Sequence, residues 1–147
     1  MEGLNFMYSG KPEDNKVEMV NLNQEETCWK QMKLGKLYAK SARYDKALLC
    51  YNKAIEMESS ELSFFFYRGV ARFHMNDLKG AFEDMKKAKT ANPWNMIDIL
   101  NYMACIHFRL GETKQAREMV TQVLNLNRGL LNDLVMSYDE YIELTSK

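Results

Sequence analysis

The stretch LGKLYAKSARYDKALLCYNKA, residues 34–54, contains a pattern of small and aromatic residues that returns further along the chain. The small residues recur 34 positions later, in the pairs Gly35 and Gly69, Ala47 and Ala81, and Ala54 and Ala88. A third copy follows at a spacing of 35, in which Ala104 takes the place of Gly69 and Ala116 that of Ala81. Self-similarity at a fixed period of about 20–50 residues is typical of repeat architectures.

Each copy is predicted to be a pair of helices joined by a tight turn. Leu34, Leu37 and Tyr38 follow helical spacing, and a second apolar stripe starts at Ala47. Residues 42–45 leave room only for a short turn between them, and residues 76–77 and 111–112 take the same place later. The one extra residue of the third copy is expected in segment 91–95, because a turn tolerates a change of length.

Two of the recurring small residues are glycines inside predicted helices. Gly35 and Gly69 each cost up to about 1 kcal/mol relative to alanine in a helix. A cost of this size indicates that another helix passes close by, and Ala47 and Ala81 are expected to face them from the second helix of each pair.

The recurring residues resemble the tetratricopeptide repeat (TPR) family. The first copy matches the family at Leu34, Gly35, Tyr38, Ala47, Tyr51 and Ala54, and the later copies match with more divergence. The resemblance implies an all-α fold, an α-solenoid of three TPR hairpins within residues 27–147. The repeats are expected at about 28–61, 62–96 and 97–130.

Both ends of the chain differ from the repeats. Residues 130–145 carry apolar residues at helical spacing, and we expect a seventh helix that caps the exposed face of the last hairpin. Residues 1–26 are expected to be a tail or a short extra element, and a tail that folds back into the binding groove stays open as an alternative.

Composition argues against nucleic-acid binding, a disulfide framework and a membrane span. Lys and Arg total 20 and Asp and Glu total 20, so the chain has no cationic excess for general nucleic-acid binding. Three cysteines without a CxxC pair argue against a disulfide framework and favour a reducing compartment, for which we predict the cytoplasm. No apolar stretch approaches the ~20 residues that span a membrane, and no secretory signal is visible.

The sequence predicts neither an enzyme nor a cofactor. His74 and His107 are the only histidines, and neither has a catalytic partner at a motif spacing. Cys105 and His107 lie two positions apart on a predicted helix, so their side chains diverge and cannot share a metal ion. No phosphate-binding or dinucleotide-binding glycine pattern occurs.

The family's geometry places the first helix of each hairpin on the concave face of the array. The resemblance therefore implies a partner-binding set of fourteen residues on three helices: Trp29, Met32, Lys36 and Lys40; Phe66, Tyr67, Val70, Phe73 and His74; Asn101, Tyr102, Cys105, Phe108 and Arg109.

This expected surface is apolar in its middle and polar at its rim, which is typical of an interaction site. The run from Phe64 to Tyr67 cannot lie wholly in the core, because consecutive residues circle a helix. We therefore expect a protein–protein interaction module, an adaptor that holds an apolar peptide segment of a partner.

One known family function can be tested residue by residue. TPR co-chaperones hold the acidic C-terminus of Hsp70 or Hsp90 with a two-carboxylate clamp of Lys, Asn and Arg side chains. The matching places hold Met32 with Lys36, then Tyr67, then Asp98 with Tyr102. Only Lys36 is cationic and Asp98 would repel a carboxylate, so we expect no clamp.

Other readings stay open. One is a TPR co-chaperone or a chaperone that holds an aggregation-prone client, similar in architecture to the chaperones of type III secretion translocators. A homodimer is also possible, because eleven methionines and exposed aromatic residues make an adaptable surface.

Overall fold

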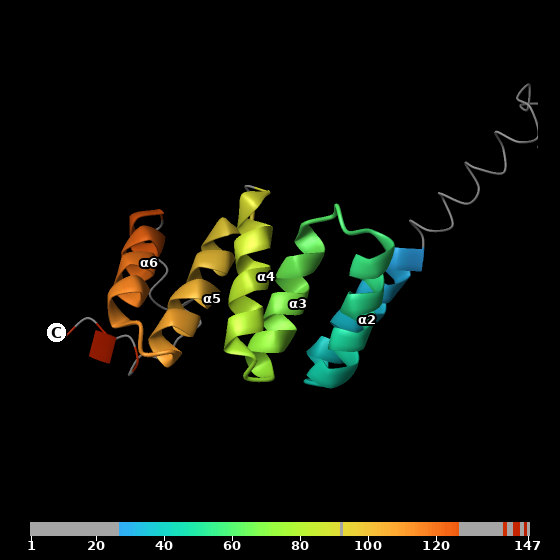
Figure 1. Cartoon of the computed structure of the whole chain (residues 1–147), viewed down its shortest axis with the longest axis horizontal. Coiled ribbons are helices and arrows are strands. Elements are labelled where there is room, and N and C mark those ends of the chain that lie inside the picture. Colours follow the sequence, from blue (N-terminus) through green and yellow to red (C-terminus); the bar gives the residue numbers. More distant parts are fainter. Residues whose placement is uncertain (1–26, 92, 127–139, 141–142, 145, 147) are drawn as a thin grey trace, which may run out of the picture.

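The computed structural model describes residues 27–91, 93–126, 140, 143, 144 and 146. Within these residues the chain forms a helix at 27–40, followed by α2 (Tyr44–Met57), α3 (Ser63–His74), α4 (Leu78–Thr90), α5 (Met96–Arg109) and α6 (Thr113–Leu126). The helices stand side by side in chain order, and the described part contains no strand (Figure 1). The expected all-α solenoid of helical hairpins is confirmed.

The hairpins stack on one another through alternating contacts. The helices of a pair pack together, as α3 does with α4 and α5 with α6, while α2 against α3 and α4 against α5 join successive pairs. A direct contact between α3 and α5 brings the first helices of neighbouring hairpins together. We call the side formed by helix 27–40, α3 and α5 the inner face.

The three hairpin turns share one backbone geometry. Ala42, Asn76 and Gly111 each adopt a left-handed conformation, with φ of 55°, 64° and 79°. In each turn the next residue donates its N–H to a carbonyl five positions back, over 2.9 Å from Arg43 to Tyr38, with the same distance in the other two turns. This Schellman-type closure satisfies carbonyl groups that the helix end leaves without partners.

Ala42→Gly is expected to stabilise the protein by about 1 kcal/mol. A left-handed φ costs a residue with a Cβ roughly 1–2 kcal/mol, whereas glycine adopts it without strain. Glycine also gives the unfolded chain more conformational entropy, which offsets part of this stabilisation. Urea unfolding followed by circular dichroism measures the change. Gly111→Ala is the matched control, since a Cβ there meets nothing within 4 Å and only the backbone responds. Equal signs for the two variants would contradict this account of the turn.

The core consists of two clusters of buried side chains. The first gathers around Tyr51, Phe64, Met85 and Ile99, where the first two hairpins meet the third. The second gathers around Ala104, Ile106 and Val120 and includes Leu144, which is fully buried.

Parts of the expected terminal elements lie outside the described residues. Of the predicted capping helix, residues 130–139, 141, 142 and 145 are not described, while Glu140, Glu143 and Leu144 are helical. The Leu144 carbonyl accepts a hydrogen bond from Nε of Arg117 on α6, so this residue packs on the last hairpin. The predicted N-terminal element at 1–26 also lies outside the described residues.

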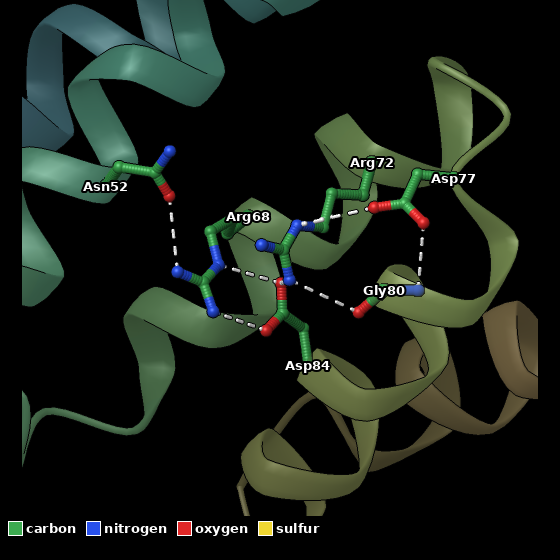
Figure 2. A network of polar contacts seen from close by, with 6 residues as sticks. All are labelled: Asn52, Arg68, Arg72, Asp77, Gly80 and Asp84. Atoms are coloured by element: carbon green, nitrogen blue, oxygen red, sulfur yellow. Dashed lines mark hydrogen bonds and ion pairs between the residues drawn. The ribbon is translucent and has the colours of Figure 1, made fainter.

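A buried carboxylate joins three helices (Figure 2). Asp84 on α4 is 2% exposed and accepts two hydrogen bonds from Arg68 on α3, at 2.9 and 2.8 Å. Arg72, one turn further along α3, donates a third at 3.0 Å. Arg68 also donates to Oδ1 of Asn52 on α2 at 3.2 Å, which extends the network to the preceding hairpin.

Candidate functional site

A pocket of about 360 Å³ opens on the inner face between helix 27–40 and α3. We call it the first pocket, and its lining is mainly apolar and aromatic: Lys36, Ala39, Lys40, Tyr44, Tyr51, Tyr67, Val70 and Ala71. Pockets of this size with few polar groups are typical places for a bound ligand or side chain.

Two lysines provide the charge around the first pocket. The Lys36 ammonium lies 4.0 Å from the centre of the Tyr67 ring, in a cation–π contact that holds its charge over the pocket wall. Lys40, one turn later, is exposed. Burial raises the pKa of Tyr51 to about 12, so its hydroxyl stays neutral at physiological pH. The site therefore combines an uncharged aromatic wall with a cationic edge.

His74 lies at the end of α3, next to this pocket. Its ring stacks on Tyr44 with centroids 4.4 Å apart and an angle of 10° between the planes. Burial, and to a lesser degree the Arg109 cation, lowers the pKa of His74 below its usual value. The imidazole is therefore neutral near pH 7 and serves as a flat aromatic surface.

Aromatic contacts continue the inner face from α3 to α5. Tyr102 packs edge-on against Phe66, at a centroid distance of 6.1 Å, and against Phe73, at 5.3 Å. Arg109 lies 4.7 Å over the Phe73 ring and pairs with Glu140 at 3.6 Å. The aromatic side chains of α5 and of the end of α3 therefore use much of their contact surface on one another.

A second pocket, of about 220 Å³, lies at the loop end of α3. Its lining comes from the α2–α3 loop, α3, α4 and the α4–α5 loop: Glu61, Ser63, Phe66, Tyr67, Ala88, Ala91, Pro93, Trp94 and Asn95. Tyr67 lines both pockets, which makes them neighbours on the inner face.

The structure brings part of the predicted binding set together. Lys36, Lys40, Tyr67 and Val70 line the first pocket, and Phe66 lines the second. His74 and Tyr102 adjoin them through the ring contacts described above. Trp29 is half-exposed and packs edge-on against Phe64 at 5.0 Å, and it is not among the residues that line either pocket.

Four predicted binding residues are instead buried. Met32 belongs to the first core cluster and Phe73 and Cys105 to the second, and Asn101 is buried on α5. The expectation that their side chains offer surface to a partner needs correction, because neighbouring hairpins cover them. Burial also raises the pKa of the Cys105 thiol to about 11. Phe108 is partly buried against the second cluster.

The aromatic run of α3 divides as expected. Phe64 and Phe65 are buried, while Phe66 and Tyr67 keep exposed surface on the inner face. Sequence reasoning missed Tyr44, Tyr51 and Trp94, because it assigned the site only to the first helices of the hairpins. The periodic placement of Tyr51 indicates packing between helices, and no sequence signal separates that role from a pocket wall.

The described residues contain no group of three His, Cys, Asp or Glu side chains placed to hold a metal ion. None of the described helices is long and apolar enough to cross a membrane.

Stacked helical hairpins with a pocket on the inner face place this chain in the class of helical repeat proteins. The sequence profile of the tetratricopeptide repeat matches residues 31–61. The human mitochondrial import receptor subunit TOM70 is 26% identical over 144 residues, which cover 95% of this chain and 23% of the receptor. The auxiliary subunit NAA15 of the Arabidopsis thaliana N-terminal acetyltransferase A complex is 25% identical over 118 residues, 80% of this chain and 12% of that subunit.

Solved structures share the fold. The second TPR domain of human RPAP3, in complex with the HSP70 peptide SGPTIEEVD, superposes with a TM-score of 0.64 at 17% identity, over 84% of this chain and 96% of that domain. YrrB, described as a TPR protein with an unusual peptide-binding site, gives 0.63 at 18% identity, over 88% of this chain and 74% of its own.

Residues 31–61 thus match the tetratricopeptide repeat, and the helical hairpins have the fold of solved tetratricopeptide repeat domains. It spans less than a quarter of the curated relatives that it matches. Its fold is that of a protein-interaction module, and members of the family are generally non-enzymatic scaffolds and adaptors.

Proposed function

We propose that this protein is a non-enzymatic adaptor that binds an apolar peptide segment of another protein in the first pocket. The observation that carries the proposal is the pocket itself, an aromatic cavity between two hairpins with Lys36 and Lys40 at its edge. A preformed concave surface of this kind suits an extended segment, because the pocket receives a side chain while the peptide backbone stays at the surface.

The proposed ligand differs from the acidic peptides with which some structural neighbours have been solved. The first TPR domain of Spaghetti (RPAP3) has been solved with the HSP90 peptide SRMEEVD. At the five places that match a two-carboxylate clamp, this chain has a buried Met32, the aromatic rings of Tyr67 and Tyr102, and an exposed Asp98. Lys36 alone supplies positive charge there, so we propose that this chain has no clamp.

Ala39→Trp is expected to weaken peptide binding by roughly tenfold or more. The larger side chain fills the first pocket without adding charge, so a ligand side chain loses its buried contacts, which are worth about 1.5–3 kcal/mol. The probes are peptides selected on the full chain from a phage-displayed library of random linear peptides, measured by fluorescence polarisation.

The matched control is Leu34→Trp on the same helix, at an exposed position that lines neither pocket. It should leave affinity unchanged. The peptide SRMEEVD should bind at least about tenfold more weakly than the selected apolar peptides. Equal affinities of Ala39→Trp and wild type would refute the first pocket as the site, and tight SRMEEVD binding would refute the absence of a clamp.

A client-holding chaperone remains the second proposal, because the neighbours include the N-terminal domain of the stress-induced protein STI-1 from C. elegans. The same pocket would then protect an apolar segment from aggregation. Light scattering of a client that carries the selected peptide separates the two proposals: an adaptor binds without suppressing aggregation, and a chaperone suppresses it. We keep a cytoplasmic location and a possible homodimer as predictions.

A further inference from the structure

Trp94 is the most exposed large apolar side chain in the described part of the protein. It lies in the loop between α4 and α5, and 92% of its surface is accessible. Tryptophan is enriched among the residues that carry most of the energy of protein interfaces, because a large rigid ring gains much contact area at little entropic cost. An exposed tryptophan beside a pocket is therefore a candidate for contact with a ligand that enters the pocket.

The second pocket gives Trp94 an apolar setting. Pro93 and Ala91 precede Trp94 in the sequence and line the same pocket, to which α4 contributes Ala88 and α3 contributes Phe66. Four segments of the chain line the pocket, so protein surrounds it on several sides. A side chain that entered it would contact rings and methyl groups.

The two pockets share Tyr67, and we call the surface along α3 that joins them the groove. Tyr67 lines both, and its ring lies 5.4 Å from that of Phe66. Along α3 the groove runs from Val70 to Ser63, which is ~10 Å at a rise of 1.5 Å per residue. An extended peptide covers that length in about three residues at ~3.3 Å each.

Charge distinguishes the two ends of this groove. Lys36 and Lys40 mark the end at the first pocket. Glu61 marks the end at the second pocket, where its Oε1 accepts hydrogen bonds from the backbone N–H of Ser63 at 3.2 Å and from its hydroxyl at 2.6 Å. These bonds hold the carboxylate at the start of α3, so the groove has a positive end at the lysines and a negative end at Glu61.

We propose that the second pocket is a further binding subsite, which takes a large apolar side chain of the same partner peptide in contact with Trp94. The inference rests on the proposed function of the first pocket. The occupant is an extended peptide segment with an acidic residue at the end near Lys36 and Lys40 and an apolar anchor about three residues away, against Trp94. The opposite charges of the groove set the direction in which the segment lies.

The first test measures affinity. The probes are again peptides selected on the full chain from the phage-displayed library, and the variants are Trp94→Ala, with Leu49→Ala on α2 as control. Leu49 is also exposed and apolar, and it lines neither pocket. Trp94→Ala should weaken binding roughly 30-fold, the size expected of an interface hot spot, while Leu49→Ala changes it less than about threefold.

The second test observes Trp94 directly. The chain has two tryptophans, so the fluorescence component that disappears in Trp94→Phe belongs to Trp94. On peptide binding this component should shift to shorter wavelength and lose its accessibility to acrylamide. A peptide with the same residues in reverse order should bind at least about tenfold more weakly, because its charge would meet the wrong end of the groove.

The outcomes separate the two proposals. Loss of binding in Ala39→Trp without any change in Trp94→Ala would leave the first pocket as the site and overturn the Trp94 subsite. No selection of peptides, combined with a Trp94-dependent increase in mass on light scattering, would overturn it in favour of a contact between two copies of the chain. Equal binding of the reversed peptide would overturn the assigned direction.

Discussion

Asp84→Ala is expected to lower the free energy of unfolding by about 3–5 kcal/mol. The substitution removes a buried carboxylate that accepts hydrogen bonds from two guanidinium groups. It leaves Arg68 without a counter-charge and Arg72 with only the more exposed Asp77, at 3.7 Å. The loss should appear as a fall in the urea midpoint with an unchanged slope, measured by far-ultraviolet circular dichroism.

The neighbouring Glu83→Ala is the matched control. Glu83 lies on the same helix, is exposed, and pairs only with Lys86 at 3.1 Å. Surface pairs of this kind contribute at most about 1 kcal/mol, so the control should change stability by no more than that. A loss in Asp84→Ala no larger than in Glu83→Ala would show that the buried network does not stabilise the stack.

The third hairpin suggests a compensated variant of the network. Its positions that correspond to Arg68, Arg72 and Asp84 are occupied by Met103, His107 and Met119. Replacing a buried ionic cluster with packed apolar residues is often neutral or stabilising, whereas removing one partner is costly. The triple variant Arg68→Met, Arg72→His, Asp84→Met should therefore lose less than half of what Asp84→Ala loses.

Gly35→Ala is expected to destabilise the protein by roughly 1–3 kcal/mol, although alanine is the better helix former. A Cβ at position 35 would lie 2.5 Å from Cε1 of Tyr51. That ring is 2% exposed, so it cannot move aside without disturbing the first core cluster. Thermal and urea unfolding measure the loss.

The sign of this effect should reverse when Tyr51 is made smaller. The three hairpins pair Gly35 with Tyr51, Gly69 with Met85 and Ala104 with Val120, so the larger first-helix residue accompanies the smaller second-helix residue. In a Tyr51→Val background, Gly35→Ala should stabilise by about 1 kcal/mol through helix propensity alone. A destabilising effect in both backgrounds would show that contact with Tyr51 is not the reason for glycine.

Local sequence patterns sufficed to predict the helices and their turns. The 34-residue period places small residues where two helices cross, and the short segments at 42–45, 76–77 and 111–112 allow only tight turns. These features depend on residues close together in the chain, and the observed hairpins follow them. Four members of the expected binding set are nevertheless buried, because the side of a helix that stays exposed depends on what packs against it.

Cys105 and Tyr51 illustrate that limit. Both occupy positions of helical periodicity, yet Cys105 is fully covered, whereas the largely buried Tyr51 forms the wall of a pocket. Trp94 gave no periodic signal at all, because it stands in the loop that carries the extra residue. Its significance appears only when that loop lies beside the start of α3.

The amino-acid order alone therefore established the all-α repeat, the hairpin turns and the need for close helix crossings, since each follows from backbone preferences and side-chain size over one period of the chain. The packing of helices within and between hairpins established the rest: which aromatic side chains are covered, where two pockets share Tyr67, and how Asp84 meets two arginines. Those features arise between residues twelve or more positions apart, such as Asp84 and Arg72, and the physical cause is the mutual burial of packed helices.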